Sequence, residues 1–380
     1  MKPVQKYIKF NKKYIDKDAL NVVKTIHKAG YEAYFVGGCV RDLLLGLEPK
    51  DFDIATNARP EQINKLFSRS RLIGRRFLIV HVVFSARKFI EVATFRSGKV
   101  TTDKSGTVVR DNSYGSIEDD VFRRDFNINA LYYDVINNTV IDYVGGLDDL
   151  SEREIHMIGK PSERFQQDPV RMIRAVRFEV KLKASLSEDI LKAIRIQANL
   201  LENVSPARLY EECIKLFHNE RSLDVFDNLE KYGLMPHLFN QTKKTEFIEK
   251  ALLNTSIRIK NNRPVTPAFL FAVFLWQAQN ERYELIKKNI KSNYIAMTQA
   301  SEEVILEQIK QTSLPRWLTS RVKDIWILQT KLERRQPKKV KQLLLNPRFR
   351  IAYDFLLLRS QSTNPELIKI AEFWTKKQIS

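Results

Sequence analysis

Hydrophobic and polar positions follow two different periods along this 380-residue chain. In the first part, short runs of β-forming residues alternate with polar ones, and residues 78–84 and 89–95 flank a polar turn that predicts a β-hairpin. From about residue 160 onward, the apolar positions recur at helical spacing. We therefore predict an α+β fold, in which a mixed β-sheet comes first and an all-α region follows it.

The same patterns predict individual elements. A helix is expected over residues 18–28, where Leu20, Val23 and Ile26 share one face, and a long helix over 116–135 begins at the N-cap Ser116. Residues 97–120 lack periodicity and are expected to form a long loop. The remaining expectations are an irregular basic arm (1–17), a helix (60–67), strands (139–144 and 153–159) and a Gly-Gly turn (145–146).

The length of the chain exceeds what one hydrophobic core usually supports. We expect the apolar run 269–278 to be a core helix, because it is too short to span a membrane. Cys39 and Cys213 are too far apart in sequence to suggest a disulfide framework. The expected divisions are the arm (1–17), a head (18–159), a helical neck (160–240) and a helical body (241–380).

The positive charge is concentrated toward the C-terminus. The net charge is +19, and residues 241–380 hold 26 Lys and Arg against 12 Asp and Glu, which leaves only +5 for the first 240 residues. Such a basic region favours binding of a polyanion, although a basic helical domain without a nucleic-acid partner has the same composition. Because the first residues contain no apolar run long enough for a signal peptide, we expect a cytoplasmic protein.

The segment FVGGCVRDLLLGLEPKDFDIAT (35–56) combines a Gly-Gly turn with two aspartates. Because strand side chains alternate between faces, Asp51 and Asp53 would lie side by side. Two such carboxylates repel unless a cation binds them, and Mg²⁺ accepts one or two carboxylates together with water and phosphate oxygens. Gly37 and Gly38 would let the backbone approach an anion closely. Alternatively, the acid pair is a solvated strand edge.

Further polar residues interrupt apolar segments. Glu91 lies within a predicted strand and is either an outward-facing residue or a third acid near the aspartate pair. Arg123, Arg124, Asp125 and Asn129 form a polar cluster, in which a helix would place the last two on one face, available to a ribose or phosphate. An intrahelical cluster of ions and amides without a ligand explains the same pattern.

A second polar site is predicted near residue 170. Asp168 precedes Pro169, as in an N-cap followed by a proline at the first helical position. Arginines then recur at three-residue steps, and a carboxylate near a guanidinium can recognise the edge of a nucleobase. Arg208 begins a later helix and could simply pair with Glu211. The three regularly spaced arginines are Arg171, Arg174 and Arg177.

Together these motifs resemble one protein family. The run GGCVRDLLLG, the following DFD, the block RRDFNINA and the segment QDPVR are similar to those of the class II tRNA CCA-adding enzymes and bacterial poly(A) polymerases. The resemblance extends over residues 18–374. It implies a nucleotidyltransferase head with a mixed sheet, followed by an all-α neck and body.

The resemblance also implies roles for the candidate residues. Asp51 and Asp53 would bind two catalytic Mg²⁺ ions, with Mn²⁺ as an alternative, and Asp125 and Glu91 would be further catalytic carboxylates. Gln167 replaces the glutamate that begins the base-reading motif of the family, which puts the support of the neighbouring arginine in question. The residues implied in nucleotide binding are Gly37, Gly38, Arg41, Arg124, Asn129, Asp168, Arg171, Arg174, Arg177 and Arg208, with Asp42 in support.

Residues 72–84, which include Arg75, Arg76 and His81, resemble a block that marks the poly(A) polymerase branch, as do residues 346–359. The implied activity is template-independent addition of AMP from ATP to RNA 3′ ends. We expect the 3′ ends of mRNA and small RNA to be the substrates, with tRNA as a further candidate. Some members carry a long arginine-rich tail after the last residue printed here, so we expect RNA binding to be weaker or differently placed. The alternatives are a CCA-adding enzyme and a non-catalytic RNA-binding protein.

Overall fold

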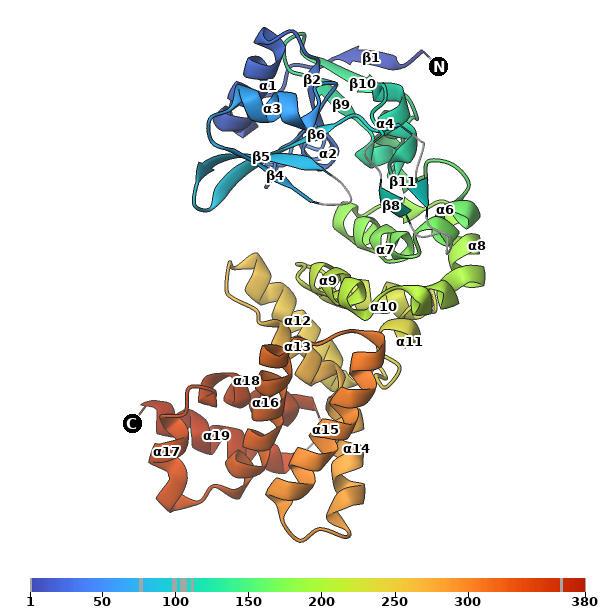
Figure 1. Ribbon diagram of the computed structural model, residues 1–380. Coiled ribbons are helices and arrows are strands. Elements are labelled where there is room, and N and C mark those ends of the chain that lie inside the picture. Colours follow the sequence, from blue (N-terminus) through green and yellow to red (C-terminus); the bar gives the residue numbers. More distant parts are fainter. Residues whose placement is uncertain are drawn as a thin grey trace. The chain divides into compact units, whose positions relative to one another are not determined.

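The computed structural model describes residues 2–74, 78–97, 101–102, 108–110, 113–362 and 365–379. Its internal contacts divide the chain into two compact units (Figure 1). The first unit contains Met1–Arg164 and Ala184–Ile190, and the second contains Phe165–Lys183 and Leu191–Ser380. A mixed sheet with helices in the N-terminal part, followed by helices, confirms the predicted α+β class.

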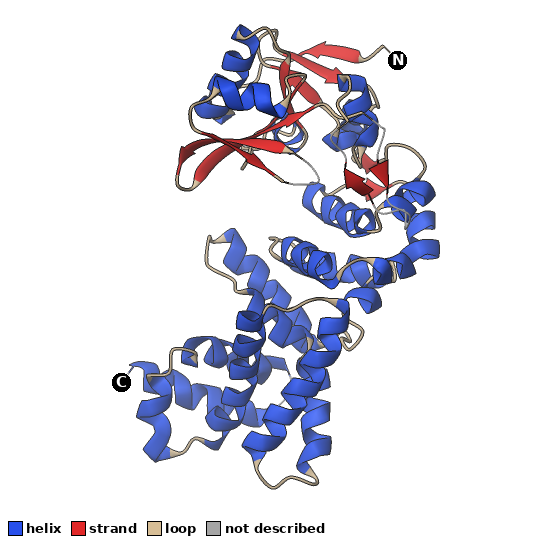
Figure 2. Cartoon of the chain, viewed as in Figure 1, coloured by secondary structure: helices blue, strands red, loops and turns tan. Residues whose placement is uncertain are grey.

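Figure 2 shows the strands of the first unit in red. Among the described residues, its main sheet has eight strands in the order β1-β10-β9-β2-β3-β6-β5-β4. Strand β3 runs parallel to β6, whereas the other neighbouring pairs are antiparallel. The strands are β1 (Val4–Tyr7), β2 (Ala33–Val36), β3 (Asp53–Thr56), β4 (Ser70–Ile73), β5 (Ile79–Ser85), β6 (Lys88–Thr94), β9 (Tyr132–Asp134) and β10 (Thr139–Asp142).

Helices cover both faces of this sheet. On one face, α1 buries Val22, Val23 and Ile26 against the sheet, because its apolar residues recur at helical spacing. The carboxylate of Asp16 caps this helix by accepting hydrogen bonds from two backbone N–H groups. The other face packs partly against α4. The helices of this unit are α1 (Lys17–Lys28), α2 (Gly38–Leu44), α3 (Pro60–Leu66), α4 (Ile117–Arg123) and α5 (Gly146–Glu152), with short 3₁₀ turns η1 (Lys12–Tyr14) and η2 (Asn127–Asn129).

Three expected elements are wrong in part: the basic arm, the long helix and the strand at 153–159. Residues 4–7 of the expected irregular arm form the edge strand β1, whose side chains are all exposed, so no hydrophobic pattern could reveal it. The long helix expected over 116–135 ends at Arg123. After it, η2 and the central strand β9 follow, because Tyr132 and Tyr133 are completely buried in the sheet.

The expected final strand at 153–159 is much shorter, since only β11 (Glu154–Ile155) forms, and it pairs with β12 (Ser185–Leu186) outside the main sheet. The predicted hairpin is confirmed as β5 and β6. Much of the loop expected over 97–120 lies outside the described residues. Its described part includes a short antiparallel pair, β7 (Thr101–Thr102) and β8 (Val108–Arg110).

The second unit is helical. Its first helix, α7, buries Met172, Ile173 and Val176 completely and packs on α9 and α10. Helices α6 (Pro161–Gln167) and α8 (Glu188–Gln197) cross the boundary between the units. The helices that follow are α7 (Val170–Leu182), α9 (Pro206–Phe217), α10 (Ser222–Lys231), α11 (Met235–Leu238), α12 (Glu246–Lys260), α13 (Pro267–Phe274), α14 (Trp276–Lys287), α15 (Asn293–Gln311), α16 (Arg316–Arg334), α17 (Val340–Leu344), α18 (Phe349–Ser362) and α19 (Pro365–Ile379), with 3₁₀ turns η3 (Ala198–Asn203) and η4 (Pro337–Lys339).

Aromatic residues form much of the core of the second unit. Phe274 in α13 lies 4.7 Å from Phe217 and 5.1 Å from Phe239 between ring centroids. The apolar run 269–278 is therefore a core segment, as expected, and no helix in the described part of the chain is long and apolar enough to cross a membrane. Phe349 and Phe355 are also buried.

Substitutions of two adjacent glycines can test the steric requirements of the turn before α5. Gly145 has a φ of +83° with open space around it, whereas a Cβ on Gly146 would lie 2.4 Å from the carbonyl oxygen of Asn127. We expect Gly146→Ala to lower the free energy of unfolding by about 2 kcal/mol or more, because the obstacle is backbone. Gly145→Ala should cost about 1 kcal/mol, the usual penalty for a positive φ. Denaturant unfolding of both variants measures the difference, and equal losses would contradict the predicted steric conflict.

Candidate active site

Asp51 and Asp53 lie at the beginning of β3. Asp53 is the first residue of the strand and Asp51 lies two residues before it. Phe52 and Ile54 are only 6% and 1% exposed, whereas both aspartates are exposed. The predicted alternation is therefore confirmed, although Asp51 lies outside the strand itself. Phe52 and Ile54 belong to the core that α1 covers, so the Asp53 side chain lies on the opposite face, with Asp51 close enough for its charge to act on Asp53.

A third carboxylate, that of Glu91, lies beside this pair. The parallel pairing of β3 and β6 places Glu91 directly opposite Asp53. Burial raises the pKa of Glu91, and the positive charge of Arg96 offsets part of the effect. The Glu91 carboxylate also lies 3.8 Å from Nε2 of His81, whose ring stacks on Phe89. Glu91 was expected to be either an outward-facing residue or a third acid near the aspartates. In the structure it is both partly exposed and adjacent to Asp53.

The electrostatics of Asp53 reflect this crowding of negative charge. Although part of the Asp53 surface is open to solvent, partial burial of the carboxylate raises the pKa of Asp53 to about 6. The charges of Glu91 and Asp51 add to this effect, and Arg124 opposes it. A bound cation would relieve this repulsion. The donors fit Mg²⁺, which typically keeps several waters and binds substrate phosphates beside one or two carboxylates. Among the described residues, no cluster of three or more acidic, histidine or cysteine side chains is close enough to enclose a metal by itself.

The Gly-Gly turn lies against two arginines. Gly37 has a φ of +74° and precedes α2, which begins at Gly38. A Cβ on Gly37 would lie 3.5 Å from Nη1 of Arg124, and a Cβ on Gly38 would lie 3.6 Å from Nη2 of Arg41. The positive φ favours glycine at position 37, and the turn lies beside two guanidinium groups. This arrangement is suited to a polyphosphate.

Arg41 is held in a buried hydrogen-bond network. It is 3% exposed and donates from Nε and Nη2 to Oδ1 of Asp42, and from Nη1 to Oδ1 of Asn129 at 2.7 Å. Asn129 in turn donates to Oδ1 of Asp125, which also accepts from the backbone N–H of Phe126. Asp125 and Asn129 are thus brought together as expected, but by a loop and η2, since α4 ends before them.

Arg124 has its own set of partners, which sequence reasoning missed. Its Nε and Nη2 donate to Oδ2 of Asp120, and Nε also donates to the hydroxyl of Tyr132. The guanidinium lies 5.2 Å from the ring centroid of Tyr132. The i,i+4 spacing of Asp120 and Arg124 was a signal, but Tyr132 comes from β9, which the sequence placed in a helix. These partners fix Arg124 beside Gly37.

In the second unit, Asp168 and Arg208 form an ion pair with Nη2 and Oδ2 2.7 Å apart. The expected i,i+3 partner of Arg208 was Glu211, so the longer-range partner is a new finding. Asp168 also accepts from the N–H of Val170 with its Oδ1, as a capping residue does. The Asp168 carboxylate is thereby held at the start of α7.

The three arginines along α7 differ in their surroundings. Nη1 of Arg171 donates to Oε1 of Gln167 at 3.4 Å, so the glutamine amide contacts this arginine where the family has a glutamate. Arg177 lies 3.5 Å from the buried carboxylate of Glu212. Arg174 and Arg177 both lie near the ring of Phe178, at 5.6 and 5.1 Å from its centroid. Arg177 therefore contributes to packing between α7 and α9.

Comparison with known proteins covers almost the whole chain. Residues 33–156 match the poly A polymerase head domain, 185–245 match a family described as the probable RNA and SrmB-binding site of polymerase A, and 289–380 match the polymerase A arginine-rich C-terminus. Poly(A) polymerase I of Salmonella typhi is 43% identical over 97% of this chain and 84% of its own length. The chain belongs to the bacterial poly(A) polymerase I family.

The CCA-adding enzymes are more distant from this poly(A) polymerase family member. That of Geobacillus thermodenitrificans is 38% identical, but over 61% of this chain and 57% of its own length. The crystal structure of the Bacillus stearothermophilus CCA-adding enzyme with CTP has a TM-score of 0.64 and 29% identity over 95% of this chain and 81% of its own. The predicted family and branch are confirmed, and the chain is a nucleotidyltransferase. Arg75 and Arg76 of the branch-specific block lie outside the described residues.

The raised pKa of Asp53 leads to a prediction about metal binding. Protons and Mg²⁺ compete for a carboxylate, so the apparent affinity for Mg²⁺ should fall as pH drops through about 6, by about tenfold for each further pH unit. Above pH 7 the affinity should change little, since Asp53 is already ionised. Titration calorimetry with Mg²⁺ at a series of pH values measures this dependence.

Two variants control the experiment. The variant Asp53→Asn should lose both Mg²⁺ binding and the pH dependence of that binding. It should also have a higher melting temperature than the wild type in EDTA, because a carboxylate with a raised pKa destabilises the fold when it is charged. Asp148→Asn removes an exposed carboxylate from α5 and should change neither. A wild-type affinity that stays constant between pH 7 and pH 5 would contradict the assignment.

Proposed function

We propose that this enzyme adds AMP units from ATP to the 3′ hydroxyl of RNA without a template. The observation that carries the proposal is the identity of 43% with poly(A) polymerase I along 97% of the chain. The head carboxylates and arginines described above support it, because they form the polar groups that nucleotidyl transfer requires. In the reaction, the 3′ oxygen forms a bond to the α-phosphorus of ATP, the bond to pyrophosphate breaks, and the hydroxyl proton leaves to solvent.

The head residues divide this work. Asp51 and Asp53 would hold Mg²⁺, or Mn²⁺, which when bound supplies positive charge for the triphosphate and lowers the pKa of the attacking hydroxyl. Glu91 adds negative charge beside Asp53 and so strengthens the attraction for a cation. Arg124, fixed beside Gly37, is suited to contact the triphosphate. The role of these groups is mainly positioning and charge stabilisation.

Arg41, Asp125 and Asn129 have a related role in the proposal. All three are nearly buried and linked by hydrogen bonds, which keeps the Asn129 amide and the Asp125 carboxylate in fixed orientations. We assign contact with the ribose or phosphate to Asn129, and catalytic support to Asp125. Arg41 is then a positioning residue, since its guanidinium is already occupied by Asp42 and Asn129.

We further propose that the second unit selects the base. The Asp168 carboxylate can accept from the amino group of adenine, and the Arg171 guanidinium can donate to a ring nitrogen. Arg208 holds Asp168 in place, while Arg174 and Arg177 complete the positive flank of α7. The net charge of +14 over residues 241–380 favours a polyanionic primer. We propose RNA as the second substrate. We also propose a helical neck over residues 160–240 and a helical body over residues 241–380.

A CCA-adding activity is the second candidate, because the CCA-adding enzyme solved with CTP shares the fold along most of the chain. Primer extension with one nucleotide at a time separates the two. With ATP alone and a generic RNA primer, the enzyme should synthesise long tails, and CTP alone should give little product. Long tails that require CTP, or a single addition confined to tRNA, would contradict the proposal.

The same assay tests the catalytic carboxylates. Asp51→Ala and Asp53→Ala should each reduce incorporation by about a thousandfold or more, because the loss of a metal ligand removes charge stabilisation from the transition state. RNA binding should remain close to that of the matched control Asp148→Ala, and neither aspartate variant should melt at a lower temperature than this control. Incorporation near the wild-type level in either aspartate variant would refute the site.

The ion pair between Arg208 and Asp168 tests base selection. Arg208→Gln should lower the preference for ATP over CTP, measured as a ratio of kcat/KM values, by about tenfold, because the carboxylate loses its fixed orientation. Glu211→Gln changes an exposed residue of the same helix and should leave the ratio unchanged. An unchanged preference in Arg208→Gln would mean that Asp168 does not read the base.

A further inference from the structure

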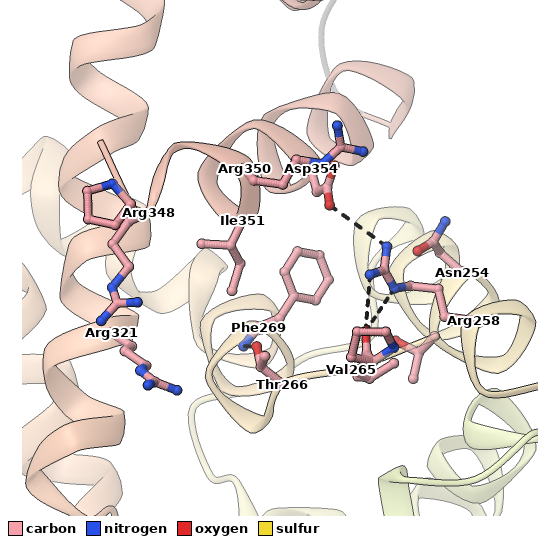
Figure 3. A pocket seen from close by; sticks show the side chains of 13 residues that line it. Asn254, Arg258, Val265, Thr266, Phe269, Arg321, Arg348, Arg350, Ile351 and Asp354 are labelled. Atoms are coloured by element: carbon pink, nitrogen blue, oxygen red, sulfur yellow. Dashed lines mark hydrogen bonds and ion pairs between the residues drawn. The ribbon is translucent and has the colours of Figure 1, made fainter. Parts of the chain in front are cut away.

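The second unit contains a pocket of about 270 Å³ that none of the sites above uses (Figure 3). Helices α12, α13 and α16, the loop before α13 and the start of α18 line it. Its lining combines the apolar side chains of Phe269 and Ile351 with one carboxylate, that of Asp354. The lining also includes four arginines: Arg258, Arg321, Arg348 and Arg350. The pocket therefore has an apolar part and an excess of positive charge.

The apolar part is a fixed aromatic ring. Phe269 is partly exposed, and Figure 3 shows its ring between Ile351 and Asp354. On the core side, the ring packs edge-on against the fully buried Phe355, with centroids 6.0 Å apart. Phe355 itself packs against Trp276 at 5.3 Å. A ring that is held in this way and open to a pocket can stack with a nucleobase at little entropic cost.

The carboxylate beside this ring is also held in place. Arg258 donates from Nε and Nη2 to the carbonyl oxygen of Pro264 at 3.2 and 3.0 Å, and its Nη1 lies 3.8 Å from Oδ2 of Asp354. Nε of Arg350 lies 3.2 Å from Oδ1 of Asp354. The two carboxylate oxygens keep further lone pairs and can accept a hydrogen bond from an exocyclic amino group.

Arg321 and Arg348 lie together in the pocket, away from Arg258 (Figure 3). The guanidinium of Arg321 is 5.0 Å from the ring centroid of Trp317, and within the described chain no carboxylate lies at ion-pair distance from it. Nε of Arg348 is 3.7 Å from Asp324, and its side chain is 41% exposed. Two guanidinium groups at one end of a pocket are suited to a phosphate.

We propose that this pocket binds one nucleotide of a single-stranded RNA, with the base on Phe269 and the phosphate at Arg321 and Arg348. The inference rests on the proposed function, in that RNA is the second substrate. An RNA chain fits better than a free nucleotide, because residues 241–380 carry a net charge of +14 and Arg350 is 72% exposed, where it can meet a neighbouring phosphate.

Binding of fluorescent oligo(A), measured by anisotropy without Mg²⁺ or ATP, tests the proposal independently of catalysis. Arg321→Gln should weaken binding by about tenfold and make the dependence on salt shallower by about one unit of slope. Arg316→Gln removes the same charge from an exposed position of the same helix and should bind within about twofold of wild type. Phe269→Leu should also weaken binding by about tenfold, because stacking is lost.

Phe373→Leu is the matched control for Phe269→Leu, since Phe373 is another partly buried phenylalanine of this unit, outside the pocket. Melting temperatures verify the fold of each variant, and Arg321→Gln remains decisive if Phe269→Leu unfolds. Binding by Arg321→Gln as tight as by Arg316→Gln overturns the inference, as does free AMP that competes as well as the oligonucleotide does. If the wild type did not add AMP to RNA, the proposed function would be overturned, but these binding results would still stand.

Discussion

The partial burial and mutual repulsion of carboxylates on the neighbouring strands β3 and β6 are the constraint on which the site depends. Asp51 and Asp53 lie at the beginning of β3, and Glu91 lies opposite Asp53 on β6. Burial raises the pKa of Asp53 to about 6, and the charges of Glu91 and Asp51 add to this effect. Such an arrangement costs stability in the absence of a cation. The nearby positive charge of Arg124 offsets only part of that cost. An excess of negative charge therefore lies beside the start of β3, which is what the proposed Mg²⁺ site requires.

The surrounding fold supplies the rigidity that this arrangement needs. The parallel pair β3 and β6, an exception in an otherwise antiparallel sheet, sets Glu91 opposite Asp53. The buried Arg41 links α2 to η2 through Asn129, so the Gly-Gly turn and the loop after α4 are held to each other. Gly146 allows α5 to approach the backbone of this loop closely.

The sequence predicted the fold class, the hairpin, the alternation around Asp53 and the family, because each depends on local pattern or short motifs. It failed where tertiary contacts decide the structure. The block 116–135 has helical spacing at its beginning, yet Tyr132 belongs to a central strand that only the assembled sheet could define. The exposed strand β1 has no apolar pattern at all. The partner of Arg208 lies 40 positions away in Asp168, and local spacing favoured Glu211 instead.

We propose that Asp51 and Asp53 jointly bind a divalent cation together with a nucleoside triphosphate. The most direct measurement is a crystal structure of this enzyme with Mn²⁺ and a non-hydrolysable ATP analogue, in which anomalous scattering locates the manganese. Our account predicts a manganese ion coordinated by both carboxylates and by phosphate oxygens of the analogue. Manganese bound elsewhere, with the two side chains turned away from the triphosphate, would contradict it.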